Sequence, residues 1–536
     1  MMNALVLACA LSASATDPAD GVTYRDLSVA VEGELLDARL VQVVGDERPE
    51  LVLVERSAAT KKREIHIYTY ADQSDALNAN PWRTIPVFDD VIAFAIADVR
   101  GEPGNELLFF TRGGVFAMSP GTEGLRGNIA LLIRTDLIYE VADPTDLPYW
   151  DYVIEGERDS IVVPGSSTFS VWSAAANGSG AYVERAEFSA YSSAGTLDEA
   201  GQVVVRQQAT VTVGGSSAGV SRSDSDASRM LIRSENSRGL HLLSFDRAYA
   251  APGLADVDGD GADDLVVISG KSAVIYLTSG GAFPAHPSRI EELPDYLLSE
   301  GRILDTATIR FEDLDGDGDV DIFVRDVADE EDQSALSNTI RLLFLRNDGR
   351  RLFPAKPDQL MRFEALELRA EVTDVDADGT LDLVVRKFEV PSVVDVVTSL
   401  EFTHTTLLYP GRGKPSGQFF ERRAVLKSEH VYDEDSVGGA IAQRTLSWDC
   451  SDDGIADLVE VDVQGRVHIQ RVMRESGFFS GETWSIDRDP WKRFDARGEI
   501  GSLVVDDFNG DGLGDILSRR DDGVLLLFSS RKGSAR

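Results

Sequence analysis

The sequence predicts an all-β protein built from about eight similar units that close into a ring. Three observations lead to this prediction: one acidic turn motif recurs, a short β-branched run follows each copy, and the copies are almost evenly spaced. The chain has 536 residues, of which 43% are hydrophobic, so it can bury a large core. Its 6 Trp, 13 Tyr and 23 Phe argue against a disordered acidic chain.

The acidic motif is D-x-[DNS]-x-D-G-x-x-D, and it occurs five times. Its first position is always aspartate: Asp256, Asp313, Asp374, Asp449 and Asp507. Its third position is polar: Asp258, Asp315, Asp376, Ser451 and Asn509. Its fifth position is aspartate: Asp260, Asp317, Asp378, Asp453 and Asp511. Its sixth position is glycine: Gly261, Gly318, Gly379, Gly454 and Gly512. Its ninth position is aspartate: Asp264, Asp321, Asp382, Asp457 and Asp515.

This spacing suits calcium, which takes about six to eight oxygen ligands. A chain that curls round one ion can turn its odd-numbered side chains inward, and the glycine supplies the positive φ that a sharp turn needs. The seventh position can offer its backbone carbonyl, so its side chain is free to vary: Ala262, Asp319, Thr380, Ile455 and Leu513. We predict up to five Ca²⁺ ions, held best by the first three loops because Ser451 and Asn509 each replace a carboxylate.

Calcium loops of the EF-hand type begin in the same way but need a bidentate glutamate at position 12 and a helix on each side. Position 12 here is Val267, Val324, Val385, Glu460 and Ser518. The runs that follow position 9, such as LVVI and IFV, are typical of buried strands. The loops therefore join strand to strand. A single copy would be explained as a solvated acidic turn, but five copies with the same glycine and three invariant aspartates favour an ion site.

Three weaker copies lie upstream, with their first positions at Gln42, Asp98 and Tyr152. They should keep the strand–turn–strand shape without the ion. Including them, successive first positions are mostly 54 to 61 residues apart, with one gap of 75 and one of 104. Such a period, with four short strands per unit, predicts a β-propeller of four-stranded antiparallel blades. Eight blades are preferred and seven are the alternative; the longest gap contains an insertion at about residues 193–245.

The two ends of the propeller favour closure of the ring. The last unit stops one strand short, whereas residues 23–31 supply a spare strand before the first loop. Pairing that strand into the last blade would remove an open edge, which is otherwise an aggregation hazard. The propeller is thus expected to span residues 16–530, with residues 531–536 as a C-terminal tail.

The N-terminus predicts export. An apolar run followed by Ala13-Ser14-Ala15 resembles a secretory signal in residues 1–15, although Cys9 also lies in a short lipoprotein-like sequence. A secreted, periplasmic or cell-surface location is therefore expected. The formal charge of −39 argues against nucleic-acid partners and anionic membrane surfaces. No run of about 18 apolar residues predicts a membrane span.

The D-x-[DN]-x-D-G-x-x-D-[LI] repeats resemble FG-GAP/VCBS repeats, as found in the β-propeller of integrin α subunits and in exported bacterial proteins. The resemblance covers roughly residues 23–530 and implies calcium in the five loops. It departs from integrins in having neither leg domains nor a membrane span, and in having eight candidate loops where integrins have seven blades.

These features predict a calcium-binding, non-enzymatic and monomeric scaffold that binds or adheres to a protein or glycan. Its partner is expected on the face opposite the metal loops, in the irregular segments at residues 193–245, 326–333, 390–400 and 430–437. A propeller enzyme that acts on extracellular polysaccharide and a structural spacer in a surface assembly are the alternatives. No catalytic residues can be assigned, and neither an H-E-x-x-H motif nor a paired-cysteine pattern supports a catalytic zinc.

Overall fold

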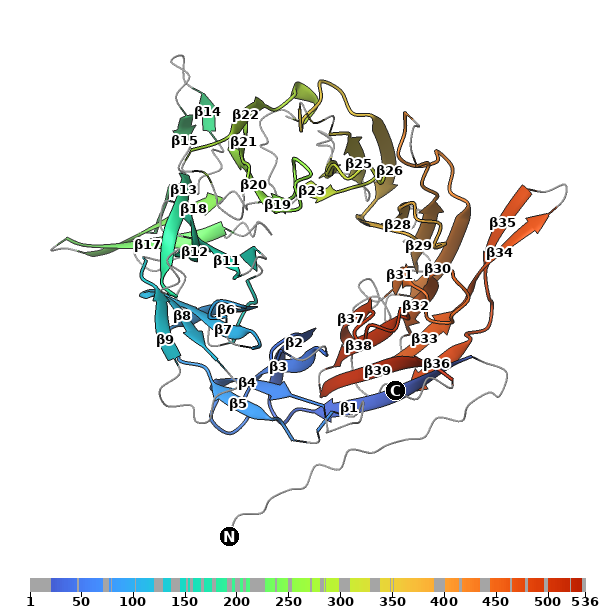
Figure 1. Ribbon diagram of the computed structural model, residues 1–536, viewed down its shortest axis with the longest axis horizontal. Coiled ribbons are helices and arrows are strands. Elements are labelled where there is room, and N and C mark those ends of the chain that lie inside the picture. The colour runs from blue at the N-terminus through green and yellow to red at the C-terminus, as the bar shows by residue number, and fades with distance from the viewer. Residues whose placement is uncertain are drawn as a thin grey trace, which may run out of the picture.

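Eight four-stranded antiparallel sheets form a closed ring, which Figure 1 shows in full. The computed structural model describes residues 21–45, 48–70, 77–78, 80–101, 103–119, 129–135, 145–150, 153–154, 158–164, 168–175, 180–189, 195–197, 203–205, 209–212, 227–236, 239–248, 253–269, 272–279, 284, 286–297, 309–327, 338–347, 349, 351–389, 401–413, 417–433, 444–462, 465–477, 481–495, 500–520 and 522–532. Within these residues the only helical element is one 3₁₀ turn, Asp295–Leu297. The prediction of eight blades is confirmed.

The first four blades follow the order of the chain. Blade 1 contains β2 (Glu34–Val41), β3 (Glu50–Arg56), β4 (Arg63–Tyr68) and β5 (Arg83–Pro86). Blade 2 contains β6 (Val91–Ala97), β7 (Glu106–Thr111), β8 (Gly114–Met118) and β9 (Ile129–Ile133). Blade 3 contains β10 (Val153–Ile154), β11 (Ser160–Pro164), β12 (Thr168–Ala174) and β13 (Tyr182–Ser189). Blade 4 contains β19 (Gly253–Ala255), β20 (Asp264–Ser269), β21 (Ser272–Tyr276) and β22 (Arg289–Glu292).

The remaining blades complete the ring. Blade 5 contains β23 (Ile309–Glu312), β24 (Asp321–Val327), β25 (Asn338–Leu345) and β26 (Gln359–Ala365). Blade 6 contains β27 (Glu367–Thr373), β28 (Asp382–Glu389), β29 (Glu401–Tyr409) and β30 (Leu426–Asp433). Blade 7 contains β31 (Arg444–Trp448), β32 (Asp457–Val461), β33 (Arg466–Gln470) and β36 (Lys492–Asp495). Blade 8 contains β37 (Ile500–Asp506), β38 (Asp515–Arg520), β39 (Gly523–Arg531) and β1 (Val22–Ala30).

The N-terminal strand closes the ring, as predicted. β1 pairs antiparallel with β39 from Val22 opposite Arg531 to Ala30 opposite Gly523. In Figure 1 the blue strand β1 accordingly lies along the red strand β39. The last blade thus gains its fourth strand from the other end of the chain.

Three small sheets lie outside the blades. The strands β14 (Gly195–Leu197), β15 (Val203–Val205), β16 (Ala209–Thr212), β17 (Ala227–Asn236) and β18 (Gly239–Ala248) come between blades 3 and 4. Of these, β14 pairs with β15, whereas β18 pairs with β16 and β17. The hairpin of β34 (Val472–Gly477) and β35 (Gly481–Ile486) leaves blade 7 before its last strand and projects from the ring in Figure 1.

The core of the protein lies between the blades. Eight apolar clusters fill the eight interfaces between neighbouring blades, one cluster at each. The second strands are short continuous apolar runs because both of their faces pack against neighbours, as in β3 and β7. The fourth strands β22 and β36 bury no residue completely, since they form the rim. No helix in the described part of the chain has the length and hydropathy of a membrane span.

Candidate metal-binding loops

The predicted motifs form the loops between the first and second strands of blades 4 to 8. We number the loops by blade: loop 4 (residues 256–264), loop 5 (313–321), loop 6 (374–382), loop 7 (449–457) and loop 8 (507–515). In each of them the ninth position is the first residue of the second strand. All blades run in the same direction round the ring, so the five loops emerge on one face.

The aspartate at position 1 organises each loop through backbone hydrogen bonds. In loop 4, Oδ1 of Asp256 accepts the N–H of Asp260 at 3.0 Å and Oδ2 accepts the N–H of Gly261 at 2.7 Å. The other four loops repeat both bonds, from positions 5 and 6 to Asp313, Asp374, Asp449 and Asp507. The position-5 aspartate in turn accepts the N–H of position 7 in all five loops. The five loops therefore share one backbone geometry.

Two residues in each loop have left-handed backbone conformations. The expected positive φ at position 6 is found in all five glycines, at 82° to 87°. Position 4 is also left-handed, although no positive φ was expected there; its residues are Gly259, Gly316, Ala377, Asp452 and Gly510. Three of these five are glycines, so a signal for this turn was present in the sequence.

The aspartate at position 9 is buried, and its carboxylate accepts hydrogen bonds from backbone N–H groups of the turn. One of its carboxylate oxygens accepts the N–H of position 2 in loops 4 to 7 and of position 3 in loop 8, at 2.8 to 3.2 Å. The other oxygen accepts an N–H from the end of the third strand in loops 4, 5, 6 and 8, for example from Thr278 to Asp264 at 2.6 Å. In loop 7 this second oxygen, Oδ1 of Asp457, is buried without a hydrogen-bond partner.

The degenerate loops of blades 1 and 2 have a glutamate at position 9, and its carboxylate likewise accepts hydrogen bonds from backbone N–H groups of the turn. Glu50 accepts the N–H groups of Val43 and Val44 at 2.8 and 3.0 Å, and Glu106 accepts those of Val99 and Arg100 at 3.1 Å. In blade 3 the hydroxyl of Ser160, which is also buried, bonds instead to that of Ser173. Position 9 is thus polar in all eight blades, with or without the acidic positions that an ion would need.

Three of the five loops bring three carboxylates close together. In each of these loops the ligand atoms of the cluster lie within 4.8 Å of one another. The clusters are Asp256, Asp258 and Asp260; Asp313, Asp315 and Asp321; and Asp374, Asp376 and Asp382. Loops 7 and 8 form no such cluster among the described residues, and they are the loops in which Ser451 and Asn509 replace a carboxylate.

Arginine side chains offset part of this acidic charge. Arg346 lies 2.9 Å from Asp315 in loop 5, and Arg474, from the β34–β35 hairpin, lies 2.5 Å from Asp376 in loop 6. Arg531 links loops 7 and 8, because its Nε donates to Asp452 and its Nη1 donates to the carbonyl of Asp511.

Burial raises the pKa of every position-9 aspartate. The pKa rises to about 6 for Asp264, to about 7 for Asp321, Asp382 and Asp515, and to about 8 for Asp457, with desolvation as the main cause in each case. Neighbouring loop carboxylates add to the shift. A bound cation would oppose both effects, because it favours the charged form of each carboxyl group.

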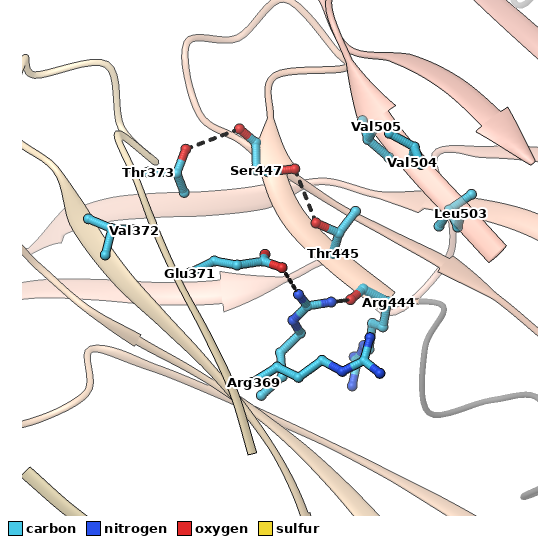
Figure 2. A pocket seen from close by; sticks show the side chains of 11 residues that line it. Arg369, Glu371, Val372, Thr373, Arg444, Thr445, Ser447, Leu503, Val504 and Val505 are labelled. Carbon is cyan, nitrogen blue, oxygen red and sulfur yellow. Dashed lines mark hydrogen bonds and ion pairs between the residues drawn. The ribbon is translucent and has the colours of Figure 1, made fainter. Parts of the chain in front are cut away.

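A separate pocket of about 370 Å³ lies between the first strands of blades 6, 7 and 8. Figure 2 shows the arginine side chains of β27 and β31 beside the hydroxyl groups of Thr373, Thr445 and Ser447, with apolar residues of β37 opposite. Arg386, from β28, bonds to Glu371 and to the carbonyl of Arg444. No sequence motif marks this pocket, because its residues come from three blades.

The buried arginines of this pocket keep unused donors. Arg386 is 7% exposed and Arg444 is 3% exposed. Neither Nε of Arg386 nor Nη1 of Arg444 has a hydrogen-bond partner. Burial lowers the pKa of Arg386; Glu371 opposes this shift, and the charges of Arg369, Arg310 and Arg444 add to it. Unused donors in a basic cluster are suited to an anionic group.

The segments expected to bind a partner lie mostly outside the described residues. All of residues 390–400, most of residues 326–333 and half of residues 430–437 fall there. In residues 193–245 only the backbone of β14 to β18 is described. Residues 1–20, which contain the expected export signal, also lie outside the described residues.

The comparisons with known proteins agree with this architecture. A family model described as an FG-GAP-like repeat matches residues 256–324 and 313–385, which contain loops 4, 5 and 6. No curated protein has significant sequence similarity to the chain.

Two solved structures match the chain at low similarity. A chain from the structure of an Agrocybe aegerita lectin, described as specifically recognising non-reducing terminal N-acetylglucosamine, is 12% identical, with a TM-score of 0.35 over 94% of this chain and 96% of that chain. A chain from the structure of BBS1N in complex with ARL6DN, soaked with lead, is 10% identical, with a TM-score of 0.32 over 97% of this chain and 96% of that chain. The repeat match and the eight blades together show an eight-bladed β-propeller that contains FG-GAP-like repeats in residues 256–385.

Proposed function

We propose that the protein is an exported, non-catalytic scaffold whose calcium-bound loops hold the blades in place while another surface binds a protein or glycan. The single observation that carries the proposal is one loop geometry repeated in five consecutive blades, with acidic side chains at alternate positions. FG-GAP propellers are typically non-catalytic and commonly extracellular, which supports both parts of the proposal.

The residues present fit calcium. Three buried carboxylate oxygens in the loops, Oδ1 of Asp315, Asp376 and Asp457, have no hydrogen-bond partner. The side chains at positions 1, 3, 5 and 9 and the carbonyl at position 7 would hold the ion, an all-oxygen set of the kind that Ca²⁺ prefers. When bound, the ion would neutralise carboxylates that otherwise repel one another. Its role would be structural.

Thermal melting with Ca²⁺ or with EGTA tests this role. A ligand that binds only the native state raises apparent stability, so the midpoint should rise with Ca²⁺. Asp313→Asn with Asp317→Asn should reduce this rise, and equilibrium dialysis should show one ion fewer. Asp319→Asn is the matched control, because position 7 would contribute only its backbone carbonyl. Equal midpoints in Ca²⁺ and EGTA would overturn the proposed role of calcium.

We further propose that the pocket between blades 6, 7 and 8 takes a carboxylate-bearing glycan. Arginine and carboxylate pair through two parallel hydrogen bonds, and the hydroxyl groups beside them suit sugar hydroxyls. Support comes from the exposed guanidinium of Arg369 at the pocket and from the apolar wall of Leu503 and Val504.

Uronate-containing and neutral oligosaccharides on a glycan array would test this site with Ca²⁺ present. Arg369→Ala should weaken uronate binding, because Arg369 lines the pocket. Arg412→Ala is the matched control, since both arginines are partly exposed and lie 3.1 Å from a glutamate. Binding that is equal for neutral and acidic glycans, or equally reduced in both variants, would contradict the assignment.

A further inference from the structure

We propose that Glu55, Glu64 and His66 form a binding site for a divalent transition-metal ion such as Zn²⁺, at the seam where the ring closes. The three side chains come from the β3–β4 hairpin of blade 1, which contains none of the five motif loops. This site goes beyond the proposed function and does not depend on calcium or on a partner.

The geometry of the three groups fits one small ion. Nε2 of His66 lies 3.6 Å from Oε1 of Glu55 and 3.8 Å from Oε2 of Glu64. Zinc binds imidazole nitrogen and carboxylate oxygen at about 2.0–2.2 Å in a tetrahedron, whose ligand atoms are therefore about 3.3–3.6 Å apart. Both distances from the histidine nitrogen are thus close to those that a shared ion would impose, and all three ligand atoms lie within 4.8 Å of one another. A fourth position is left for water.

The histidine ring is oriented for this role. Its Nδ1 lies 3.0 Å from the hydroxyl oxygen of Thr84, on the neighbouring strand β5. Its Nε2 is buried without a hydrogen-bond partner. When Nδ1 carries the proton and donates it to Thr84, the lone pair on Nε2 faces the two carboxylates. A hydrogen bond of this kind to the other ring nitrogen typically fixes the tautomer of a metal-binding histidine.

The two glutamates are close enough to share a cation. Glu55 and Glu64 are directly opposite each other in the β3–β4 register, and their side chains are only 11% and 23% exposed. Like charges that face each other across a strand pair are destabilising. A divalent ion would neutralise both carboxylates and would also use the free nitrogen of His66.

The site lies on the face of blade 1 that packs against blade 8. Leu53 is opposite His66 in the register, so both side chains lie on the same face. Leu53 belongs to the apolar cluster that also contains Val29 of β1 and Leu526 of β39. A metal bound here would therefore stabilise the hairpin beside the closing strands.

The donor set distinguishes this site from the loops. Imidazole nitrogen suits zinc, copper, iron and nickel, whereas Ca²⁺ takes oxygen ligands. Saturating Ca²⁺ should therefore fill the loops and leave this site open to a transition metal.

Metal titrations of the full chain in saturating Ca²⁺ test the proposal. The wild type should bind one more equivalent of Zn²⁺ than His66→Asn, which removes Nε2 but keeps a group able to bond Thr84. Co²⁺ should give a visible d–d absorption band in the wild type, and this band should be lost in His66→Asn and in Glu55→Gln.

His468→Asn is the matched control. His468 lies 2.8 Å from a single carboxylate, that of Asp462, on the corresponding third strand of blade 7. This variant should keep the extra Zn²⁺ and the Co²⁺ band. Should His66→Asn fail to fold, Thr84→Val keeps all three ligands and should still weaken Zn²⁺ binding by about 10- to 100-fold. Equal Zn²⁺ uptake by the wild type and His66→Asn, or equal loss in His468→Asn, would overturn the assignment.

Discussion

Two residues in each of the five loops, at positions 4 and 6, have a left-handed backbone conformation. A glycine at position 6 was expected to have positive φ because no other residue reaches that region without cost. Position 4 has the same conformation, yet Ala377 and Asp452 occupy it with φ of 53° and 63°. A sequence with a non-glycine residue at such a position does not reveal its φ, because the local geometry is imposed by the hydrogen bonds around it.

Two opposite substitutions should therefore have opposite effects. Ala377→Gly should stabilise the protein by about 1 kcal/mol, because it removes the cost of a left-handed residue with a Cβ. Gly318→Ala should destabilise it by a similar amount, since nothing lies within 4 Å of the added Cβ and the backbone alone is strained. Urea unfolding in Ca²⁺ would measure both. Changes of the same sign in the two variants would contradict this explanation.

The buried position-9 aspartates should make calcium-free stability depend on pH. Their pKa values of about 6 to 8 in the folded protein exceed the unfolded value of about 3.9. The folded state therefore binds more protons, and its stability is present at low pH and falls as pH rises through that range. Calcium binds the charged form, so its stabilising effect should grow over the same range.

Melting midpoints from pH 5 to pH 8, with Ca²⁺ and with EGTA, would measure this dependence. The midpoint in EGTA should fall with rising pH while the difference between the two conditions widens. Asp457→Asn should make the fall in EGTA smaller, because the aspartate with the highest pKa among the five is then removed. A difference that stays constant with pH would show that these carboxyl groups do not respond to the ion.

At the scale of elements, the second strands of blades 5, 6 and 8 each contact the next blade through an arginine four residues after position 9. Arg325 donates to the carbonyl of Leu368 at 3.0 Å, Arg386 donates to that of Arg444, and Arg519 donates to that of Ala38 at 3.0 Å. Each acceptor lies on the first strand of the next blade, including the step from blade 8 to blade 1. The arginines are visible in the sequence, but their partners are not, because the acceptors are backbone atoms of another repeat.

Arg386 should contribute more to stability than Arg325. Arg386→Met removes the bond to the next blade and also leaves Glu371 without its arginine. A hydrogen bond to a charged group contributes about 1.5–3 kcal/mol, so the loss should reach or exceed this range. Arg325→Met serves as the control, since it removes a bond of the same kind between blades 5 and 6 and should cost less. Chemical denaturation of the two variants would compare them, and an equal or larger loss for Arg325→Met would contradict the prediction.

The blades themselves were predictable because each second strand is a short apolar run after a fixed acidic position. The hairpin of β34 and β35 was not predicted, since two extra strands within one repeat period leave the spacing between motifs almost unchanged. The clusters of Glu55 with His66 and of Arg369 with Arg444 were also missed. Their members are brought together by register and by neighbouring blades, neither of which a linear motif records.

At the scale of the whole molecule, the number of blades followed from counting loops, including three whose acidic positions have degenerated. Blades 1 to 3 keep a polar residue at position 9 and bury it, so the repeat persists where the ion-binding pattern does not. Each blade packs against two neighbours through an apolar cluster, and each cluster needs both blades. Stability is therefore shared round the ring and depends on its closure.

The closing strand β1 should be essential for the folded monomer. Its buried side chains include Val22, Tyr24, Leu27 and Val29, and the hydroxyl of Tyr24 donates to the carbonyls of Cys450 and Gly514, each at 3.0 Å. Burying an apolar side chain of this size contributes about 1.5–3 kcal/mol. Four such side chains amount to about 6–12 kcal/mol, comparable with the total stability of about 5–15 kcal/mol of a typical domain.

Deletion of residues 1–31 should thus abolish the cooperative melting transition or drive association through the exposed edge of β39. Deletion of residues 1–20 is the control, because it leaves the pairing of β1 with β39 intact and should preserve the midpoint. Calorimetry and size-exclusion chromatography would measure both variants. The core of a propeller is divided among all the interfaces between its blades. Loss of one strand at the seam should therefore destabilise all eight blades together, and the whole cooperative transition should disappear. A monomeric deletion variant with an unchanged midpoint would show that the ring holds without its closing strand.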